Sequence, residues 1–131
     1  MRFGAPNGGP MPEPLEREAL NELLAMTGGD ATLFVELLDT FLTDADQYLG
    51  ELDAAAAAGD HAALLRPAHS LKSNALNVGA TRLAELSRSL EQEARTGAVA
   101  SAEAQVAAVR DELAIVREAV ASVRQEAVDG G

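Results

Sequence analysis

The chain has two histidines, and one of them has neighbours that suit nucleophilic chemistry. His69 is followed three and four residues later by Lys72 and Ser73, which a helix places beside it. A neutral imidazole nitrogen is a good nucleophile near neutral pH. The ammonium group of Lys72 can stabilise the charge on a phosphoryl group, and the small Ser73 leaves room for a partner to approach. These residues favour phosphoryl transfer at His69, with an ordinary surface histidine as the alternative.

The other histidine has a simpler interpretation. His61 directly follows Asp60, which is a suitable N-cap for a helix. We therefore expect His61 to be an exposed residue of the first helical turn.

The helix that carries His69 is expected to run from about residue 60 to residue 78. On a helical wheel, one arc collects the residues of its core face, which are Leu64, Pro67, Ala68, Leu71, Ala75 and Val78. His69 lies roughly opposite this arc and should be exposed. Leu65 and Leu76 share the His69 side, and two leucines that the core does not need predict a docking patch.

Three arginines are candidates for a basic rim around that patch. Arg66 is the best candidate because it shares the His69 side of the helix, and Arg82 and Arg88 lie on the following helix. A solvated helix face is nevertheless the preferred interpretation for each of the three.

Pro67 is awkward within a helix, because it removes a backbone hydrogen bond at a cost of about 3 kcal/mol. We expect a bend just before His69. The alternative is a helix that starts later and has Pro67 in its first turn.

The apolar spacing predicts an all-α fold with five helical segments. The first spans about residues 13–26, the second lies between Asp30 and Gly59, and the third ends before Gly79. The fourth spans about residues 81–95, and the fifth follows Ser101. We predict an antiparallel up-and-down four-helix bundle with a short additional N-terminal helix that covers one end. The bundle domain should span residues 13–127, with disordered ends at 1–12 and 128–131.

Composition excludes several classes of protein. At 131 residues the chain fits one domain, and the absence of cysteine rules out disulfides and thiolate sites. The net charge of −11 disfavours binding to nucleic acid or to anionic membrane surfaces. No apolar run has the length of a membrane span, so a cytoplasmic location is expected. Neither a metal-binding Glu-x-x-His pair nor a glycine-rich phosphate loop is visible, so we expect no metal site and no kinase activity.

Residues 68–75 (AHSLKSNA), Gly79 and the leucine-rich segment that ends at Leu90-Glu91 resemble the histidine phosphotransfer (HPt) domain family. The resemblance covers about residues 13–125, and its distinctive part is 69–91. It implies that His69 is phosphorylated on the nitrogen far from the backbone and that Lys72 lies near the phosphoryl group. Ser73 occupies the family's small position, which is most often glycine. Glu91 is expected to accept a hydrogen bond from the near imidazole nitrogen, with a solvated helix-end carboxylate as the alternative.

The resemblance also implies the partners. The chain should relay a phosphoryl group between aspartates of response-regulator receiver domains, or from a hybrid histidine kinase, as a carrier without its own turnover. The receiver supplies the Mg²⁺, so no cofactor is expected here. Leu65, Arg66, Leu76 and Arg88 are the expected partner-binding residues, and the complete bundle should be a monomer. The alternative is a docking module that binds receivers without transferring phosphate.

Overall fold

The computed structural model describes residues 13–130, and in this part of the chain every regular element is helical. The tail predicted for residues 1–12 lies outside the described residues. The elements, in chain order, are α1 (Arg17–Met26), α2 (Ala31–Ala57), a 3₁₀ turn η1 (Ala62–Leu64), α3 (Leu65–Asn77), α4 (Thr81–Arg95) and α5 (Ala102–Gly130).

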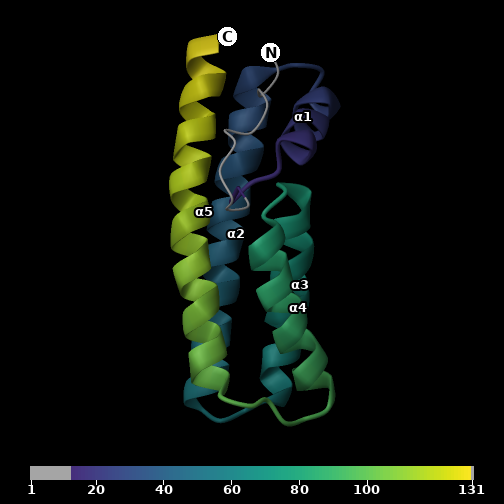
Figure 1. Ribbon diagram of the computed structural model, residues 1–131, viewed down its shortest axis with the longest axis vertical. Coiled ribbons are helices and arrows are strands. Elements are labelled where there is room, and N and C mark those ends of the chain that lie inside the picture. The colour runs from purple at the N-terminus through teal and green to yellow at the C-terminus, as the bar shows by residue number, and fades with distance from the viewer. Residues whose placement is uncertain (1–12, 131) are drawn as a thin grey trace.

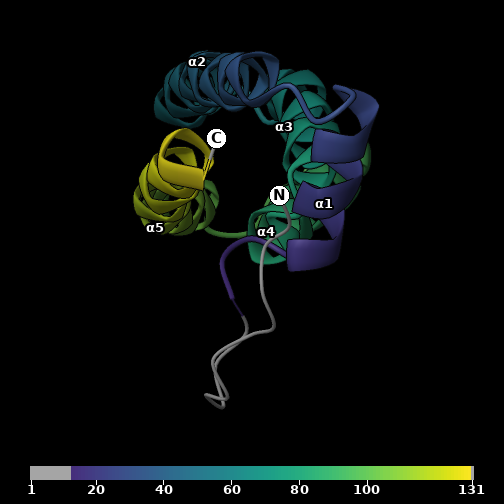
Figure 2. The same ribbon diagram turned by 90° about the horizontal axis from the view of Figure 1, so that it is seen from above.

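Helices α2 to α5 form a ring in which α2 packs against α3 and α5, and α4 packs against α3 and α5. Short connections make successive helices antiparallel, while α1 lies beside the upper part of α2 and over the upper ends of α3 and α4 (Figures 1 and 2). The predicted up-and-down bundle with an additional N-terminal helix is confirmed. Because α2 and α5 have 27 and 29 residues and α3 and α4 only 13 and 15, the long pair extends past the short pair.

Apolar residues at spacings of three and four create the core of the bundle, as expected for helices that bury one face. The carboxylate of Asp30 caps α2 by accepting a hydrogen bond from the Leu33 N–H at 3.1 Å. The largest fully buried side chains come from every helix of the ring: Phe34, Leu38, Leu52, Leu64, Leu71, Leu83, Leu90, Leu113, Val106, Val109, Val116 and Val120. Burial of these faces fixes which side of α3 points outward.

A ladder of three ion pairs runs along the outside of the α2–α5 pair. All the acids are on α2 and all the bases are on α5, and both sets are spaced by seven residues: Asp39 with Arg124, Asp46 with Arg117, and Asp53 with Arg110. Exposed pairs of this kind contribute only about 0–1 kcal/mol each. Their regular spacing nevertheless favours antiparallel alignments of α2 and α5 in which each aspartate lies opposite an arginine.

The first helix starts later than predicted, at Arg17 rather than near residue 13. The residues just before α1 are not helical but are held against the bundle by other contacts. The Glu16 N–H donates a hydrogen bond to the Gly79 carbonyl at 2.9 Å, and the Leu15 side chain is buried. Apolar spacing places Leu15, Ala19, Leu23 and Met26 on one side of this segment, but the buried face of the helix differs from this in part. Met26 is 81% exposed, and Leu20 and Leu24 are buried together with Leu23.

The predicted bend at Pro67 is wrong, and the alternative describes the structure. Residues 62–64 form a 3₁₀ turn, so α3 begins at Leu65 and Pro67 is its third residue. In the first turn of a helix the backbone N–H has no partner within the helix, so proline costs little there.

The last helix also exceeds its prediction. It continues to Gly130, so residues 128–130 are helical rather than frayed, while Gly131 lies outside the described residues. Two features stabilise this end. Ala127 is fully buried, and the Gln125 side chain donates to Asp129 at 2.9 Å, one turn away.

Gly79 ends the His69 helix, as predicted, and also contacts α1. Its φ of +74° is rarely adopted by other residues, and an added Cβ would lie 2.8 Å from the Ala19 Cβ and 2.9 Å from the Glu16 backbone nitrogen.

We predict that Gly79→Ala lowers the free energy of unfolding by about 1–3 kcal/mol. Chemical denaturation measures this change. Gly50→Ala is the control, because its helical site is open and the substitution should instead stabilise the protein by about 0.5–1 kcal/mol. Equal effects of the two variants would contradict the argument.

Candidate functional site

His69 points toward solvent because the opposite face of helix α3 is buried in the core of the bundle. All six residues predicted for the core face are buried: Leu64, Pro67, Ala68, Leu71, Ala75 and Val78. The side chain of Asn74 adds a polar tie by donating to the Phe41 carbonyl of α2 at 3.1 Å. The His69 side chain is 56% exposed as a result.

Behind His69 lies a buried carboxylate from the neighbouring helix. Glu91 of α4 is only 2% exposed, so it is not the solvated helix-end group that was the alternative. One oxygen, Oε1, accepts from Lys72 Nζ at 2.6 Å. The other, Oε2, contacts His69 Nδ1 and accepts from Arg95 Nη2 at 3.0 Å. We refer to His69, Lys72, Glu91 and Arg95 as the Glu91 cluster.

The hydrogen bonds of the Glu91 cluster determine the charge of Glu91. Burial alone raises the pKa of a carboxyl group, because it penalises the charged form. The hydrogen bonds from Lys72, His69 and Arg95 outweigh burial and lower the pKa of Glu91 from 4.5 to about 2. Glu91 is therefore a carboxylate at neutral pH.

This charge state assigns the hydrogen on the imidazole. A carboxylate only accepts hydrogen bonds, so Nδ1 of His69 is the donor and carries the hydrogen. In the neutral ring the lone pair then belongs to Nε2, which has no hydrogen-bond partner among residues 13–130. The arrangement leaves the outer nitrogen available as a nucleophile.

The other predicted site residues lie around the cluster without joining it. Ser73 is exposed one turn beyond His69, and Leu76 is 49% exposed on the same helix. Arg66 and Arg88 are exposed, each one turn from a member of the cluster, and neither forms an ion pair within the described part of the chain. Leu65 differs from its prediction, because it is partly buried and packs against the core. Of the two leucines predicted for the docking patch, Leu76 is the one that the core does not need.

Arg95 was missed by sequence reasoning. It is the last residue of α4, and its guanidinium reaches back one turn to Glu91. The only signal in the sequence is the spacing of four between Glu91 and Arg95, which allows an ion pair on one helix face. That signal is weak unless the carboxylate is known to be buried.

One further expectation needs correction, and one candidate for the basic rim pairs elsewhere. His61 is not simply an exposed first-turn residue, because its Nδ1 accepts a hydrogen bond from the Val99 N–H at 2.9 Å and so ties η1 to the loop before α5. Arg82 does not join a basic rim at His69. Its guanidinium lies 3.8 Å from Glu112 of α5, a carboxyl group whose pKa is raised by burial against the smaller opposing effect of Arg82.

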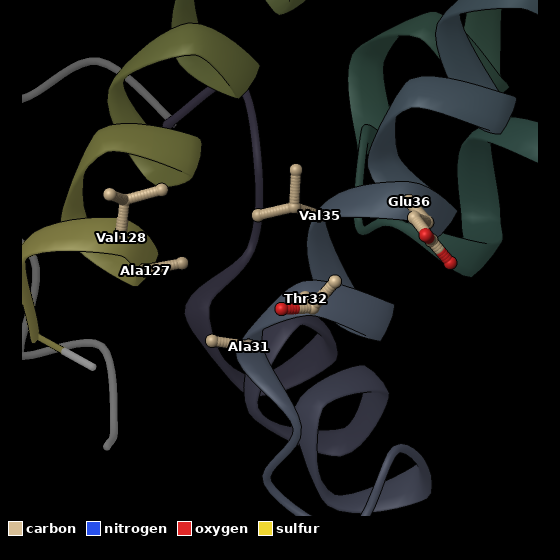
Figure 3. Close-up of a pocket in the computed structure, with 6 residues that line it drawn as sticks. All are labelled: Ala31, Thr32, Val35, Glu36, Ala127 and Val128. Carbon is tan, nitrogen blue, oxygen red and sulfur yellow. The ribbon is translucent and has the colours of Figure 1, made fainter.

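The groove at one end of the bundle lacks the side chains that make the Glu91 cluster suited to chemistry. This groove, between the first turns of α2 and the end of α5, is lined by Ala31, Thr32, Val35, Glu36, Ala127 and Val128 (Figure 3). It contains neither histidine nor cation. Residues 13–130 also include no group of three acidic or histidine side chains placed to hold a metal ion, and none of their helices is long and apolar enough to cross a membrane.

Comparisons with known proteins identify the fold and the family of this chain. The family model of the Hpt domain matches residues 36–119. Histidine-containing phosphotransfer protein B (HptB) from Pseudomonas aeruginosa PAO1 has a similar structure, with a TM-score of 0.79 and 36% sequence identity, over 86% of this chain and 96% of that one. The HPT domain of the Hpt sensor hybrid histidine kinase from Shewanella shares the fold, with a TM-score of 0.66 and 21% identity, over 82% of this chain and 92% of that one.

No curated protein matches the sequence. The family match spans more than half of the chain and includes His69, Lys72 and Glu91. The chain therefore belongs to the Hpt domain family.

Proposed function

We propose that this chain is a phosphocarrier that receives a phosphoryl group on Nε2 of His69 from one receiver domain and passes it to another. The observation that carries the proposal is the exposed imidazole whose Nδ1 donates to the buried, ionised Glu91. Membership of the Hpt domain family supports a role in phosphorelays. A receiver of a hybrid histidine kinase is a suitable donor, and the cytoplasm is the expected location.

The transfer step needs no proton to leave the site. The Nε2 lone pair attacks the phosphorus of an aspartyl phosphate, so that an N–P bond forms. The P–O bond to the aspartate breaks, and the carboxylate leaves with that electron pair. Because Nδ1 keeps its hydrogen, the phosphorylated ring is cationic, and the Glu91 carboxylate balances this charge at hydrogen-bond distance. In the reverse step an aspartate oxygen attacks phosphorus, and the N–P electron pair returns to Nε2.

Lys72 is the proposed cation for the phosphoryl oxygens. Its ammonium lies 2.6 Å from Glu91, within the same cluster as His69, and its side chain is 21% exposed. The receiver would supply the Mg²⁺ and the acidic pocket, so the chain acts as a carrier without turnover of its own. Ser73 leaves the approach to Nε2 open.

The surface around His69 suits an acidic partner with an apolar contact. The chain carries a net charge of −11, yet α3 contains two cations and no carboxylate. Such an electropositive face steers the acidic pocket of a receiver toward His69. Arg66 and Arg88 are proposed contacts at its rim, Leu76 is the proposed apolar contact, and Leu65 supports the patch from its partly buried position.

Phosphorylation by a phosphorylated receiver tests the carrier directly. We expect wild type to acquire an acid-labile, base-stable label and His69→Gln to acquire none, because amide nitrogen is not nucleophilic. His61→Gln is the matched control and should keep the label. Tight receiver binding without label in wild type would instead support a docking module, and label on the His69→Gln variant would exclude this histidine.

Leu76→Asp tests the apolar contact. The side chain is 49% exposed, so the substitution should leave the fold intact while burying a charge in the complex. We expect receiver affinity to fall about ten-fold or more, measured by titration calorimetry, with unchanged helicity. Leu33→Asp is the control, because Leu33 is also exposed but lies at the start of α2. An affinity equal to wild type would remove Leu76 from the interface.

The lowered pKa of Glu91 predicts a pH dependence of stability. Its ionised form is favoured in the folded state, so this contribution is fully present above pH 4.5 and is lost as the pH falls toward 2. We expect Glu91→Gln to be less stable than wild type at neutral pH, with a difference that shrinks between these pH values. Urea unfolding across this range provides the measurement. Glu85→Gln, at an exposed position of α4, should show no such trend, and a constant difference for Glu91→Gln would contradict the assignment.

A further inference from the structure

The guanidinium of Arg95 occupies a distinct place in the Glu91 cluster. It donates at 3.0 Å to Oε2, the oxygen that also accepts from His69 Nδ1, whereas Lys72 binds the other oxygen. The Arg95 side chain is 60% exposed, while that of Glu91 is 3% exposed. Arg95 thus brings a positive charge to a buried carboxylate without being buried itself.

The charges of the cluster explain why a second cation is needed. A phosphoryl group on His69 carries close to two negative charges and would lie near the negative charge of Glu91. Lys72 can offset one of these charges at a time, since a single ammonium is a point charge. When Lys72 turns toward the phosphoryl oxygens, the His69 ring and Arg95 remain on Glu91. The ring is cationic only while it carries the phosphoryl group, whereas the guanidinium of Arg95 is charged before, during and after transfer.

We propose that Arg95 is a positioning residue for phosphoryl transfer. It holds and neutralises Glu91, so that the carboxylate keeps its hydrogen bond to Nδ1 of His69 while Lys72 serves the phosphoryl group. Arg95 acts through Glu91 and touches neither the phosphoryl group nor the reacting nitrogen. This inference rests on the proposed carrier function.

A double-mutant cycle tests the dependence of Arg95 on Glu91. The rate of label transfer from a phosphorylated receiver is measured for wild type, Arg95→Gln, Glu91→Gln and the double variant. We expect Arg95→Gln to lower the rate about ten-fold in the wild-type background, since hydrogen bonds to charged groups are among the strong ones. In the Glu91→Gln background, where no charge needs neutralising, the same change should alter the rate less than about two-fold.

Two further variants test whether the effect depends on the positive charge at position 95 rather than on the net charge of the protein. Arg95→Lys keeps the positive charge and should retain most of the wild-type rate. Arg110→Gln is the control, because it makes the same change in net charge on α5 within the α2–α5 ladder. Receiver affinity and thermal unfolding are measured for every variant, and Arg95→Gln should leave the affinity within about two-fold of wild type.

The outcomes separate the two proposals. If Arg95→Gln slows transfer equally in both backgrounds, or weakens receiver binding in proportion to the rate, Arg95 acts on the partner and the inference is overturned. An unchanged rate for Arg95→Gln also overturns it. If wild type takes no label from any receiver, the carrier function itself fails.

Discussion

The compensation of one buried charge governs the geometry of this protein's site. A carboxylate that is removed from water is costly unless charged donors replace the lost hydration. Glu91 obtains these donors from two helices: His69 and Lys72 lie on α3, and Arg95 lies on α4. The two helices can therefore satisfy the charge only when they face each other at this level. The same contacts orient the imidazole, so burial of the carboxylate and exposure of the nucleophile are linked.

The rest of the bundle makes that alignment stable. The short α3 and α4 are connected through Gly79, whose carbonyl accepts from the Glu16 N–H and brings the start of α1 against the turn. The buried faces of α2 and α5 provide the apolar surface on which the short helices pack. The site thus lies on helices rather than on loops, which keeps its groups in a defined geometry.

The sequence predicted burial and exposure correctly where the periodicity of a single helix determines them. The helical wheel of the third helix identified both the buried face and the exposure of His69, because periodicity reports which side meets the core. The Glu91 contact was expected only through family resemblance, since the pairing of α3 with α4 depends on three-dimensional packing. Arg95 and the pairing of Arg82 with Glu112 were missed for the same reason: single-helix patterns do not reveal which carboxylate is buried. The error at Pro67 was local, because a 3₁₀ turn replaced the first turn of the expected helix.

The seven-residue spacing of the α2–α5 ladder has a consequence for how the long helices can slide. Moving α5 along α2 by one repeat, about 10 Å, would still match two acids with two bases, such as Asp39 with Arg117 and Asp46 with Arg110. A shift of half a repeat would bring no acid of the ladder opposite a base of the ladder. The ladder therefore weakly favours a few widely separated alignments of the two helices, because each exposed pair contributes only about 0–1 kcal/mol. The apolar core and the short connections between helices select one of these alignments, because they do not tolerate a shift of about 10 Å.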